Sequence, residues 1–311
     1  MKISEFELIR RMTAQVPRVL SEKGRMRDDA ALVKVAKGHL LFTTDILVEG
    51  VDFIRKQTTP EQIGQKALGV NLSDIAAMGG QPLYFTTALG IPPRMEPAWF
   101  VRFYRGMMKW AAEFHVICAG GDISSAGELL ISITVLGTCT KSGAVMRGGA
   151  KPGDWIGVTG RLGGSILGHH LSFTPRIREG CFLNHHGVHA MIDISDGFLQ
   201  DLGHILEQSG VGARLEASMI PVSREAVRKA RGDRARALEY ALSDGEDFEL
   251  LFTMNPKKAA GLTRAWKRKF SKVPLTWVGV LTDEKNKLIW SLRGKPCEAP
   301  RFQKTGFLHS L

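Results

Sequence analysis

The sequence contains few cysteines, and their placement excludes several classes of protein. Only four occur in 311 residues, at Cys118, Cys139, Cys181 and Cys297. They are far apart and form no CxxC pair, so the chain offers neither a disulfide framework nor a zinc ribbon. A paired Cys–His signature for thiol catalysis is also missing. We therefore expect the protein to work in a reduced compartment.

Long hydrophobic runs are absent as well. No stretch approaches the roughly 20 apolar residues that a membrane-spanning helix needs. The first residues, MKISEFELIRRM, place Glu5 and Glu7 among spaced apolar residues, which predicts an amphipathic helix and not a signal peptide. These absences predict a cytoplasmic protein with no membrane partner.

The common nucleotide-binding motifs are not found. The chain has no GxxxxGK[ST], no GxGxxG after a strand, and no kinase HRD or DFG. An ATP site in this protein must therefore belong to a different fold. The segment TGRLGGS (159–165) is compatible with an anion bound by backbone N–H groups and equally with a simple glycine turn.

Charge of one sign predominates. The chain has 42 Lys and Arg against 31 Asp and Glu, a net charge of +11, which favours anionic partners of any kind. The basic runs 224–236 and 257–272 alternate charge with apolar residues, as solvated helix faces do, and they contain few aromatics. We expect no nucleic-acid partner.

Hydrophobic periodicity predicts alternating strands and helices. The predicted strands include 39–48, 81–91, 115–126, 129–139, 155–160, 247–254 and 276–281, and the predicted helices include 60–79, 96–114, 162–171 and 257–270. In AMIDISDGFLQDLGHI (190–205) we expect a strand, a turn whose residues 195–197 cap a helix, and a buried stripe of Phe198, Leu202, Ile205 and Leu206. A Gly- and Pro-rich stretch at 147–154 predicts a boundary between two mixed α/β sandwich domains, 1–150 and 151–311.

Acidic residues recur in apolar surroundings beside predicted strand ends. Taken singly, each is explained by a helix cap or a turn. Taken together, several clusters flanked by Ser, Thr or Gly predict hard oxygen ligands for Mg²⁺, and the basic chain would supply phosphate contacts. This combination favours phosphoryl transfer assisted by several Mg²⁺ ions. The acids are Asp28, Asp29, Asp45, Asp74, Asp122, Asp193, Asp196, Glu246 and Asp247.

Two histidines are further candidates for metal ligands. His185 and His189 have the spacing of a zinc pair if they lie on a helix. They precede a predicted strand and no third ligand is evident. A zinc site is therefore the less favoured interpretation.

Several longer motifs follow one another along nearly the whole chain: DDAAL, TTDILVEGVDF, KALGVNLSDIAAMGGQP, GGD, RGGAKPGDWIGVTG, AMIDISDGFLQDLGHI and SDGEDFELLF. In this order they resemble the thiamine-monophosphate kinase family of the aminoimidazole-ribonucleotide-synthetase-like superfamily. The resemblance implies an α+β fold with an N-terminal ATP- and Mg²⁺-binding domain and a C-terminal domain that completes the active site. It also implies a homodimer whose N-terminal sheets pair into a barrel.

The resemblance further implies that ATP phosphorylates thiamine phosphate to thiamine diphosphate. Matched motif by motif, the implied Mg²⁺ ligands are Asp29, Thr43, Thr44, Asp45, Asp74, Asp122, Asp193 and Asp196. The implied ATP contacts are Gly121, Asp122, Arg147, Ser195 and Tyr104, with Asp193, Asp196 and Arg147 as the catalytic set. The implied acceptor contacts are Asp52, Glu246 and Lys304.

The chain departs from the family pattern mainly near the acceptor. Asp52 stands where a substrate-contacting His is usual, Asp244 replaces the first Gly of GGED, and Lys304 stands where an aromatic often stacks on thiamine. Arg27 replaces a usual Gly, and segment 170–176 lacks the usual Arg-Pro. Two alternatives remain open: a Mg²⁺–ATP-dependent kinase of a related phosphorylated acceptor, and a nucleotide-binding homologue that has lost catalysis.

Overall fold

The computed structural model describes residues 24–25, 28–36 and 38–297. The amphipathic helix predicted for the first residues lies outside this part of the chain, as do Arg27 and Lys304. Within the described residues, no helix combines the length and the apolar character needed to cross a membrane.

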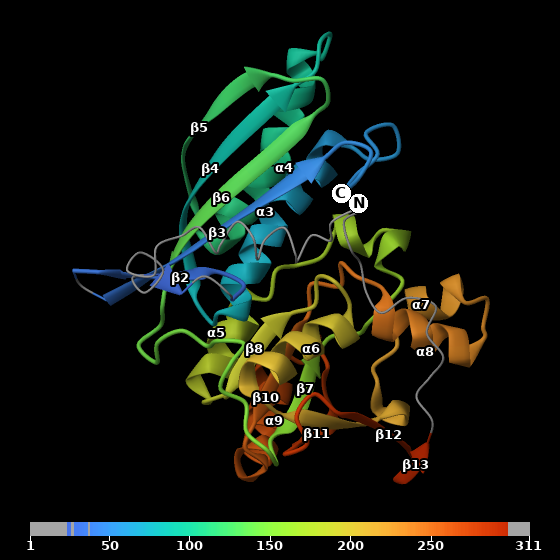
Figure 1. Ribbon diagram of the computed structural model, residues 1–311. Helices are drawn as coiled ribbons and strands as arrows, with labels where there is room; N and C mark the ends of the chain where they lie inside the picture. Colours follow the sequence, from blue (N-terminus) through green and yellow to red (C-terminus); the bar gives the residue numbers. More distant parts are fainter. Residues whose placement is uncertain (1–23, 26–27, 37, 298–311) are drawn as a thin grey trace, which may run out of the picture.

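The first unit is a six-stranded sheet covered on one face by two long helices (Figure 1). Its strands lie in the order β1-β2-β3-β6-β4-β5, and all neighbours are antiparallel except β4 and β5. The strands are β1 (Gly24–Arg25), β2 (Ala31–Val35), β3 (Gly38–Val48), β4 (Gln81–Ile91), β5 (Ile117–Ser125) and β6 (Leu130–Thr138). The helices are α3 (Pro60–Ala77) and α4 (Pro97–Phe114).

Helix α3 has a well-defined start. The Thr59 hydroxyl accepts a hydrogen bond from the Gln62 N–H at 3.2 Å, and the Gln62 side chain accepts from the Thr59 N–H at 3.0 Å, which forms a capping box. Glycines then let α3 and α4 approach closely, since a Cβ at Gly64 would lie 2.0 Å from the Phe103 carbonyl oxygen. This contact fixes the helix that carries Asp74.

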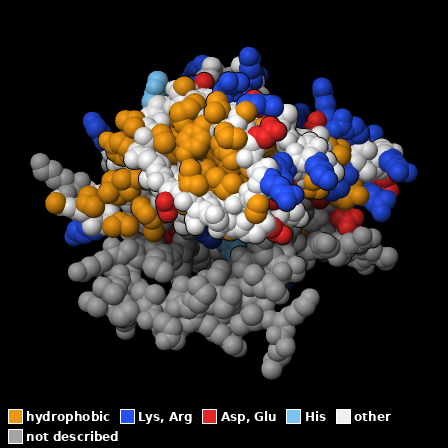
Figure 2. Space-filling view, turned by 90° about the horizontal axis from the view of Figure 1, so that it is seen from above, with side chains coloured by type: hydrophobic (Ala, Val, Ile, Leu, Met, Phe, Trp, Pro, Cys, Tyr) orange, Lys and Arg blue, Asp and Glu red, His pale blue; other side chains and the backbone are white. Residues whose placement is uncertain are grey.

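Within the described part of the chain, no helix or strand covers the outer face of the first sheet. Along β3, residues 41, 43, 45 and 47 point toward the helices, while Phe42, Thr44 and Ile46 point away from them and are exposed. Ile117 and Ile123 on β5 are 58% and 66% exposed. Seen from above, hydrophobic side chains gather in one patch over this part of the molecule, with basic side chains beside it (Figure 2).

The second unit is a seven-stranded sheet in the order β13-β12-β9-β11-β7-β10-β8, in which only β12 and β9 are parallel neighbours. The strands are β7 (Trp155–Thr159), β8 (Ala190–Asp193), β9 (Gly212–Glu216), β10 (Leu250–Met254), β11 (Leu275–Thr282), β12 (Leu288–Leu292) and β13 (Lys295–Cys297). The helices are α5 (Ile177–His185), α6 (Phe198–Ser209), α7 (Arg224–Lys229), α8 (Arg234–Ser243) and α9 (Pro256–Lys269).

One hydrophobic cluster spans both units, and the second unit has a further cluster of its own. Met191, Phe252 and Trp266 of the second unit belong to the same buried cluster as Leu41 and Phe85 of the first. Helix α3 contacts both its own sheet and β8. It therefore holds the end of β8 in a fixed position relative to the first sheet.

Most predicted elements are found, with two local corrections. Segment 162–171 does not open a helix: it forms two 3₁₀ turns, Ser165–Leu167 and His169–Leu171, because Gly163, Gly164 and Gly168 have positive φ. The strand expected from residue 247 begins only at Leu250, after two residues with positive φ. The buried stripe of α6 is confirmed, and Phe198, Leu202 and Ile205 are at most 1% exposed.

Candidate functional site

Three predicted ligands, Asp29, Asp74 and Asp193, meet where the two units join. Each offers a carboxylate oxygen, and these three oxygens lie within 4.8 Å of one another. Asp29 precedes β2, Asp74 lies in the last turn of α3, and Asp193 ends β8. Because Asp74 lies inside α3, it does not cap that helix. Residues far apart in the sequence thus form one acidic cluster.

Neighbouring hydroxyl groups orient two of these acids. The Thr43 hydroxyl donates to Asp74 Oδ2, and the Ser73 hydroxyl donates to Asp193 Oδ2 at 2.6 Å. Ser73 was not predicted as a site residue. Its position beside Asp74 in NLSDIAAM is the only signal in the sequence that could have indicated it.

Asp45 lies next to this cluster and Thr44 does not. Thr43 and Asp45 share the helix-facing side of β3, whereas the Thr44 side chain points to the open face. There the Thr44 hydroxyl donates to the Ile133 carbonyl at 3.2 Å and accepts from the Thr134 hydroxyl at 3.0 Å. The Thr44 side chain is therefore separated from the acidic cluster of its own chain.

Burial makes the negative charges of this site costly. It raises the pKa of Asp45 to about 6, with a further contribution from Asp52. Burial also raises the pKa of Asp74, and repulsion from Asp45, Asp193 and Asp29 adds to the effect. The pKa of Asp193 is raised by burial and by Asp29 in the same way. Keeping these close carboxylates ionised at neutral pH therefore costs free energy, which a bound cation would offset.

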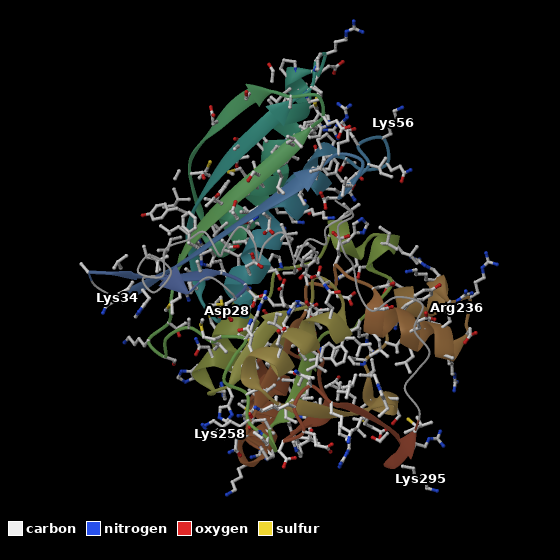
Figure 3. All side chains as sticks on the ribbon, viewed as in Figure 1. Asp28, Lys34, Lys56, Arg236, Lys258 and Lys295 are labelled. Atoms are coloured by element: carbon white, nitrogen blue, oxygen red, sulfur yellow. The ribbon has the colours of Figure 1, made fainter. Side chains whose placement is uncertain are left out.

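Arg147 supplies part of that compensation. Its Nη2 donates to Asp29 Oδ1 at 2.7 Å, and its backbone N–H donates to Asp28. Burial alone would lower the pKa of Arg147, but Asp29, Asp193 and Asp28 raise it, so the guanidinium stays charged. Figure 3 labels Asp28 at the junction of the two units. The predicted ATP contact is thus held directly against the acidic cluster.

One arginine does not satisfy all the acids. Asp29 Oδ2 and Asp45 Oδ2 are buried and have no hydrogen-bond donor among the described residues. A buried carboxylate oxygen without a partner is expensive. Two such oxygens beside a cluster of hard oxygen ligands fit Mg²⁺, which accepts several carboxylate ligands at once.

A second group of possible ligands starts at Asp196. Oxygen or nitrogen atoms of Asp196, Asp201 and His204 lie within 4.8 Å of one another. Asp201 accepts the backbone N–H groups of Asp196 at 3.2 Å and Gly197 at 3.1 Å, so it orders the turn before α6. Burial raises the pKa of Asp201, and Asp196 raises it further. The sequence analysis does not include Asp201 or His204 among the ligands. Asp201 could have been recognised as an acid that interrupts the apolar face of a helix.

The turn between β8 and α6 also contacts the predicted acceptor residues. The Ser195 carbonyl accepts the Glu246 N–H at 2.7 Å. The Glu246 carboxylate pairs with Lys66, and the same ammonium donates to the Asp52 carbonyl at 2.8 Å. The Asp52 carboxylate turns back to accept the Val48 N–H at 2.7 Å. Asp52 and Glu246 are therefore brought together.

The departure at Asp244 has a structural explanation. Asp244 Oδ2 accepts the Gly164 N–H at 2.8 Å and pairs with Lys229 Nζ at 2.8 Å. Gly163 N–H donates to both oxygens of Asp247, at 3.0 and 2.9 Å. The N–H groups of this glycine turn are thus occupied by carboxylates, which favours the turn interpretation of segment 159–165 over an anion site.

Three predicted nucleotide contacts form a separate group at the edge of the first sheet. Gly121 and Asp122 lie on β5, and Tyr104 lies on α4. Burial raises the pKa of Tyr104, and the nearby Cys118 of β5 raises it further. Strands β6 and β4 separate Asp122 from Asp45 on β3. Three interstrand spacings correspond to about 14 Å. Within one chain, Asp122 does not join the acidic cluster.

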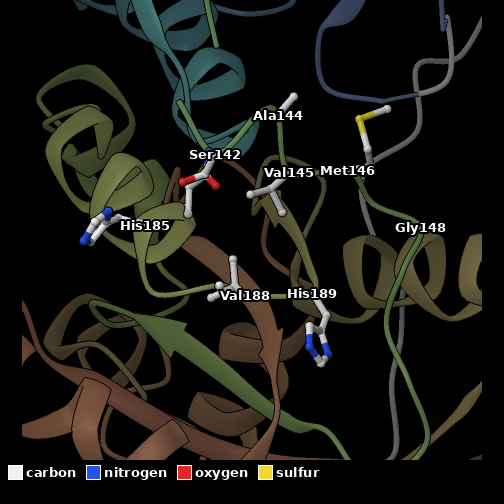
Figure 4. Close-up of a pocket in the computed structure, with 10 residues that line it drawn as sticks. Ser142, Ala144, Val145, Met146, Gly148, His185, Val188 and His189 are labelled. Carbon is white, nitrogen blue, oxygen red and sulfur yellow. The ribbon is translucent and has the colours of Figure 1, made fainter. Parts of the chain in front are cut away.

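The two histidines considered for zinc do not converge. Helix α5 ends at His185, so His185 and His189 do not share a helix face. They line opposite sides of a cavity of about 300 Å³ (Figure 4). His189 Nδ1 instead lies 2.8 Å from Asp154 Oδ2.

Comparison with known families gives two matches that together span most of the chain. Residues 27–139 match the AIR synthase related protein N-terminal domain, and residues 132–290 match the corresponding C-terminal domain.

Individual relatives extend the similarity to nearly full length. A thiamine-monophosphate kinase of Buchnera aphidicola subsp. Schizaphis graminum is 35% identical, with 99% of each chain covered. The enzyme of that name from Escherichia coli K12 is 35% identical over 95% of this chain and 96% of its own. Among solved structures, AaThiL complexed with AMPPCP and TMP superposes with a TM-score of 0.82 and 29% identity, with 99% of each chain covered.

Proposed function

This chain belongs to the thiamine-monophosphate kinase family of AIR synthase related proteins, and we propose that it transfers the γ-phosphoryl group of ATP to thiamine phosphate. The products are thiamine diphosphate and ADP. The observation that carries this proposal is the buried acidic cluster with Arg147 against it, at the junction of the two units. A solved relative that holds AMPPCP together with TMP supports the choice of both substrates.

The acceptor needs little chemical activation. A phosphate monoester has a second pKa of about 6, so it is largely dianionic at neutral pH and is already a nucleophile. The difficulty is to bring one polyanion against another in line for transfer. The task of this chain is therefore to hold both phosphates and to offset their charge. No side chain has to act as a general base.

We propose that five residues of one chain hold Mg²⁺: Asp29, Thr43, Asp45, Asp74 and Asp193. Bound Mg²⁺ would offset the negative charge of the phosphates at this site. Ser73 fixes the orientation of Asp193, and Thr43 fixes that of Asp74. Asp196 forms the start of a second acidic group, ordered by Asp201.

Arg147 is proposed to contact the ATP phosphates. Its Nη2 is held by Asp29, while its Nε is buried without a partner among the described residues. A guanidinium with an unused donor beside a Mg²⁺ site suits a planar phosphate contact. Its restraint by Asp29 means that little side-chain freedom is lost when ATP binds.

We also propose a homodimer formed through the open face of the first sheet. Phe42, Ile46 and Tyr84 on this sheet are 46%, 57% and 44% exposed, which is unusual for a contiguous sheet surface. Thr44 points to this face, and Asp122 pairs in register with the exposed Ala88. A second copy covering the face would approach both residues. It would also form the barrel of paired sheets.

Mixing two inactive variants tests this dimer. If Asp122 acts in the site of the partner subunit, Asp122→Asn and Asp193→Asn should each be inactive, yet their refolded mixture should regain about a quarter of wild-type activity. Half of the dimers would then contain one chain of each variant. In each mixed dimer one of the two sites would have both an intact Asp193 and an intact Asp122 from the partner. A mixture as inactive as its components, from a protein that is monomeric in light scattering, contradicts the dimer.

We infer a cytoplasmic location from the supply of substrate. ATP is abundant there, and the four cysteines of the chain are unpaired.

Transfer of a labelled phosphoryl group tests the function. With Mg²⁺ and γ-³²P-labelled ATP, the label should appear in thiamine diphosphate when thiamine phosphate is added, and chelation of Mg²⁺ should abolish it. Label found only in inorganic phosphate would show ATP hydrolysis without transfer. That result would contradict the proposed acceptor.

A further inference from the structure

Lys66 is a buried lysine that the proposed Mg²⁺ and ATP sites do not use. It lies on α3 and is 1% exposed, although a lysine is rarely buried unless it is paired. Its side chain is among the largest fully buried ones in the described part of the protein. A buried ammonium group needs hydrogen-bond acceptors, and the groups that accept from Lys66 indicate what it does.

The partners of Lys66 come from both units. Its Nζ donates to the Asp52 carbonyl at 2.8 Å, in the loop that follows β3, and to Glu246 Oε1 in the second unit. The Lys66 side chain is 0% exposed, but that of Glu246 is 36% exposed. Lys66 thus binds one oxygen of the Glu246 carboxylate from the protein interior. The rest of the carboxylate faces solvent at the predicted acceptor site.

The backbone around Glu246 has an unusual conformation that fixes the direction of its side chain. Glu246 and Phe248 have φ of 63° and 50°, a left-handed conformation that costs energy for residues other than glycine. Their N–H groups are fixed by the carbonyls of Ser195 and Ile194, at 2.7 and 2.8 Å. The Phe248 ring stacks on Phe173 with centroids 4.1 Å apart. Strain retained in this way is typical of functional segments.

We propose that Lys66 is a positioning residue that determines specificity for the acceptor. Its bond to the Asp52 carbonyl fixes the position of the ammonium, and the ammonium holds Glu246 by one oxygen, so the Glu246 carboxylate reaches the non-reacting part of the acceptor in a set geometry. It also neutralises Glu246, which allows an anionic acceptor phosphate to approach. This inference rests on the proposed kinase function and concerns the acceptor half of the same site.

The test compares Lys66→Met with wild type in steady-state kinetics and thermal unfolding. Loss of a charge-assisted contact that orients Glu246 should raise the KM for thiamine phosphate about tenfold or more, with the KM for ATP changed less than twofold. Lys229→Met is the matched control, since Lys229 pairs with Asp244 on the same segment. It should leave both KM values unchanged. A purely structural role would instead lower the Tm without this selective change.

A double variant keeps the inference testable if Lys66→Met folds poorly. Lys66→Met with Glu246→Gln buries no unpaired charge. Because the two residues act as a unit, its KM for thiamine phosphate should equal that of Glu246→Gln alone. A further multiplicative rise would show that Lys66 acts independently of Glu246 and would overturn the assignment.

The remaining outcomes separate this inference from the proposed function. Wild-type turnover with an acceptor KM unchanged in Lys66→Met overturns the role of Lys66 alone. An equal rise in both KM values also overturns it. No thiamine diphosphate from wild type overturns the proposed function, and this assignment with it.

Discussion

Replacing Asp45 by asparagine should stabilise the metal-free protein. Burial and Asp52 raise the pKa of Asp45 from 3.8 to about 6. Between about pH 4 and pH 6 the folded protein therefore binds more protons than the unfolded chain, so the free energy of unfolding falls as pH rises through this window. This rise in the pKa corresponds to a penalty of about 3 kcal/mol at pH 7. Asp45→Asn removes this penalty and also relieves Asp74, which Asp45 repels.

Thermal unfolding in EDTA measures this effect. For a chain of this size, about 3 kcal/mol corresponds to a Tm higher by about 5 °C for Asp45→Asn at pH 7, with little difference from wild type near pH 4. Added Mg²⁺ should raise the Tm of wild type and should raise that of the variant much less, since binding to the folded state alone stabilises it.

The exposed residue Asp283, which follows β11, provides the control. Asp283→Asn lies outside the buried cluster and should leave the metal-free Tm unchanged at both pH values. A metal-free Asp45→Asn protein less stable than wild type at pH 7 would refute the reasoning. It would show that Asp45 is held by an interaction of its own and is not strained by its neighbours.

Three further substitutions address separate parts of the site. Asp193→Asn should lower kcat at least a thousandfold while the circular-dichroism spectrum stays native, and residual activity within tenfold of wild type would contradict its place in the Mg²⁺ site. Arg147→Ala should raise the KM for ATP about tenfold with the KM for thiamine phosphate unchanged, and unaltered nucleotide kinetics would argue against an ATP contact. Asp52→His should lower the KM for thiamine phosphate a few-fold if the acceptor reaches this position. The Asp52 carboxylate accepts the Val48 N–H, so an unchanged KM would mean that the acceptor binds elsewhere.

Much of the fold could be predicted from periodicity. The alternation in β3 and the apolar stripe of α6 are visible in the sequence because one face of each element is buried. The prediction of a helix at 162–171 is wrong. It relied on apolar residues at helical spacing, whereas three glycines in this segment have positive φ and form turns. Local glycine geometry decided the outcome there.

The acidic cluster was predictable only as a set of residue types. Asp29, Asp74 and Asp193 were selected because acids in apolar surroundings need a compensating cation, and the structure brings them together. The separation of Thr44 and Asp122 from them depends on strand order and on which face each residue occupies. Single motifs contain neither kind of information.

The role of Lys66 could not be predicted from the sequence. In KALGVNLSD it has the pattern of an ordinary helix lysine. In the structure it is buried and pairs with Glu246, which lies 180 positions later in the chain. Such a pair is created by the packing of the second unit on α3. Its existence follows from tertiary structure alone.

The most direct test of the account is chromatographic detection of thiamine diphosphate after incubation of the protein with Mg²⁺, ATP and thiamine phosphate. Wild type should form the product in equal amount to ADP, and Asp193→Asn should form none under the same conditions. Product formed equally by both proteins would contradict the buried acidic cluster as the site of transfer. No product from wild type would contradict thiamine phosphate as the acceptor.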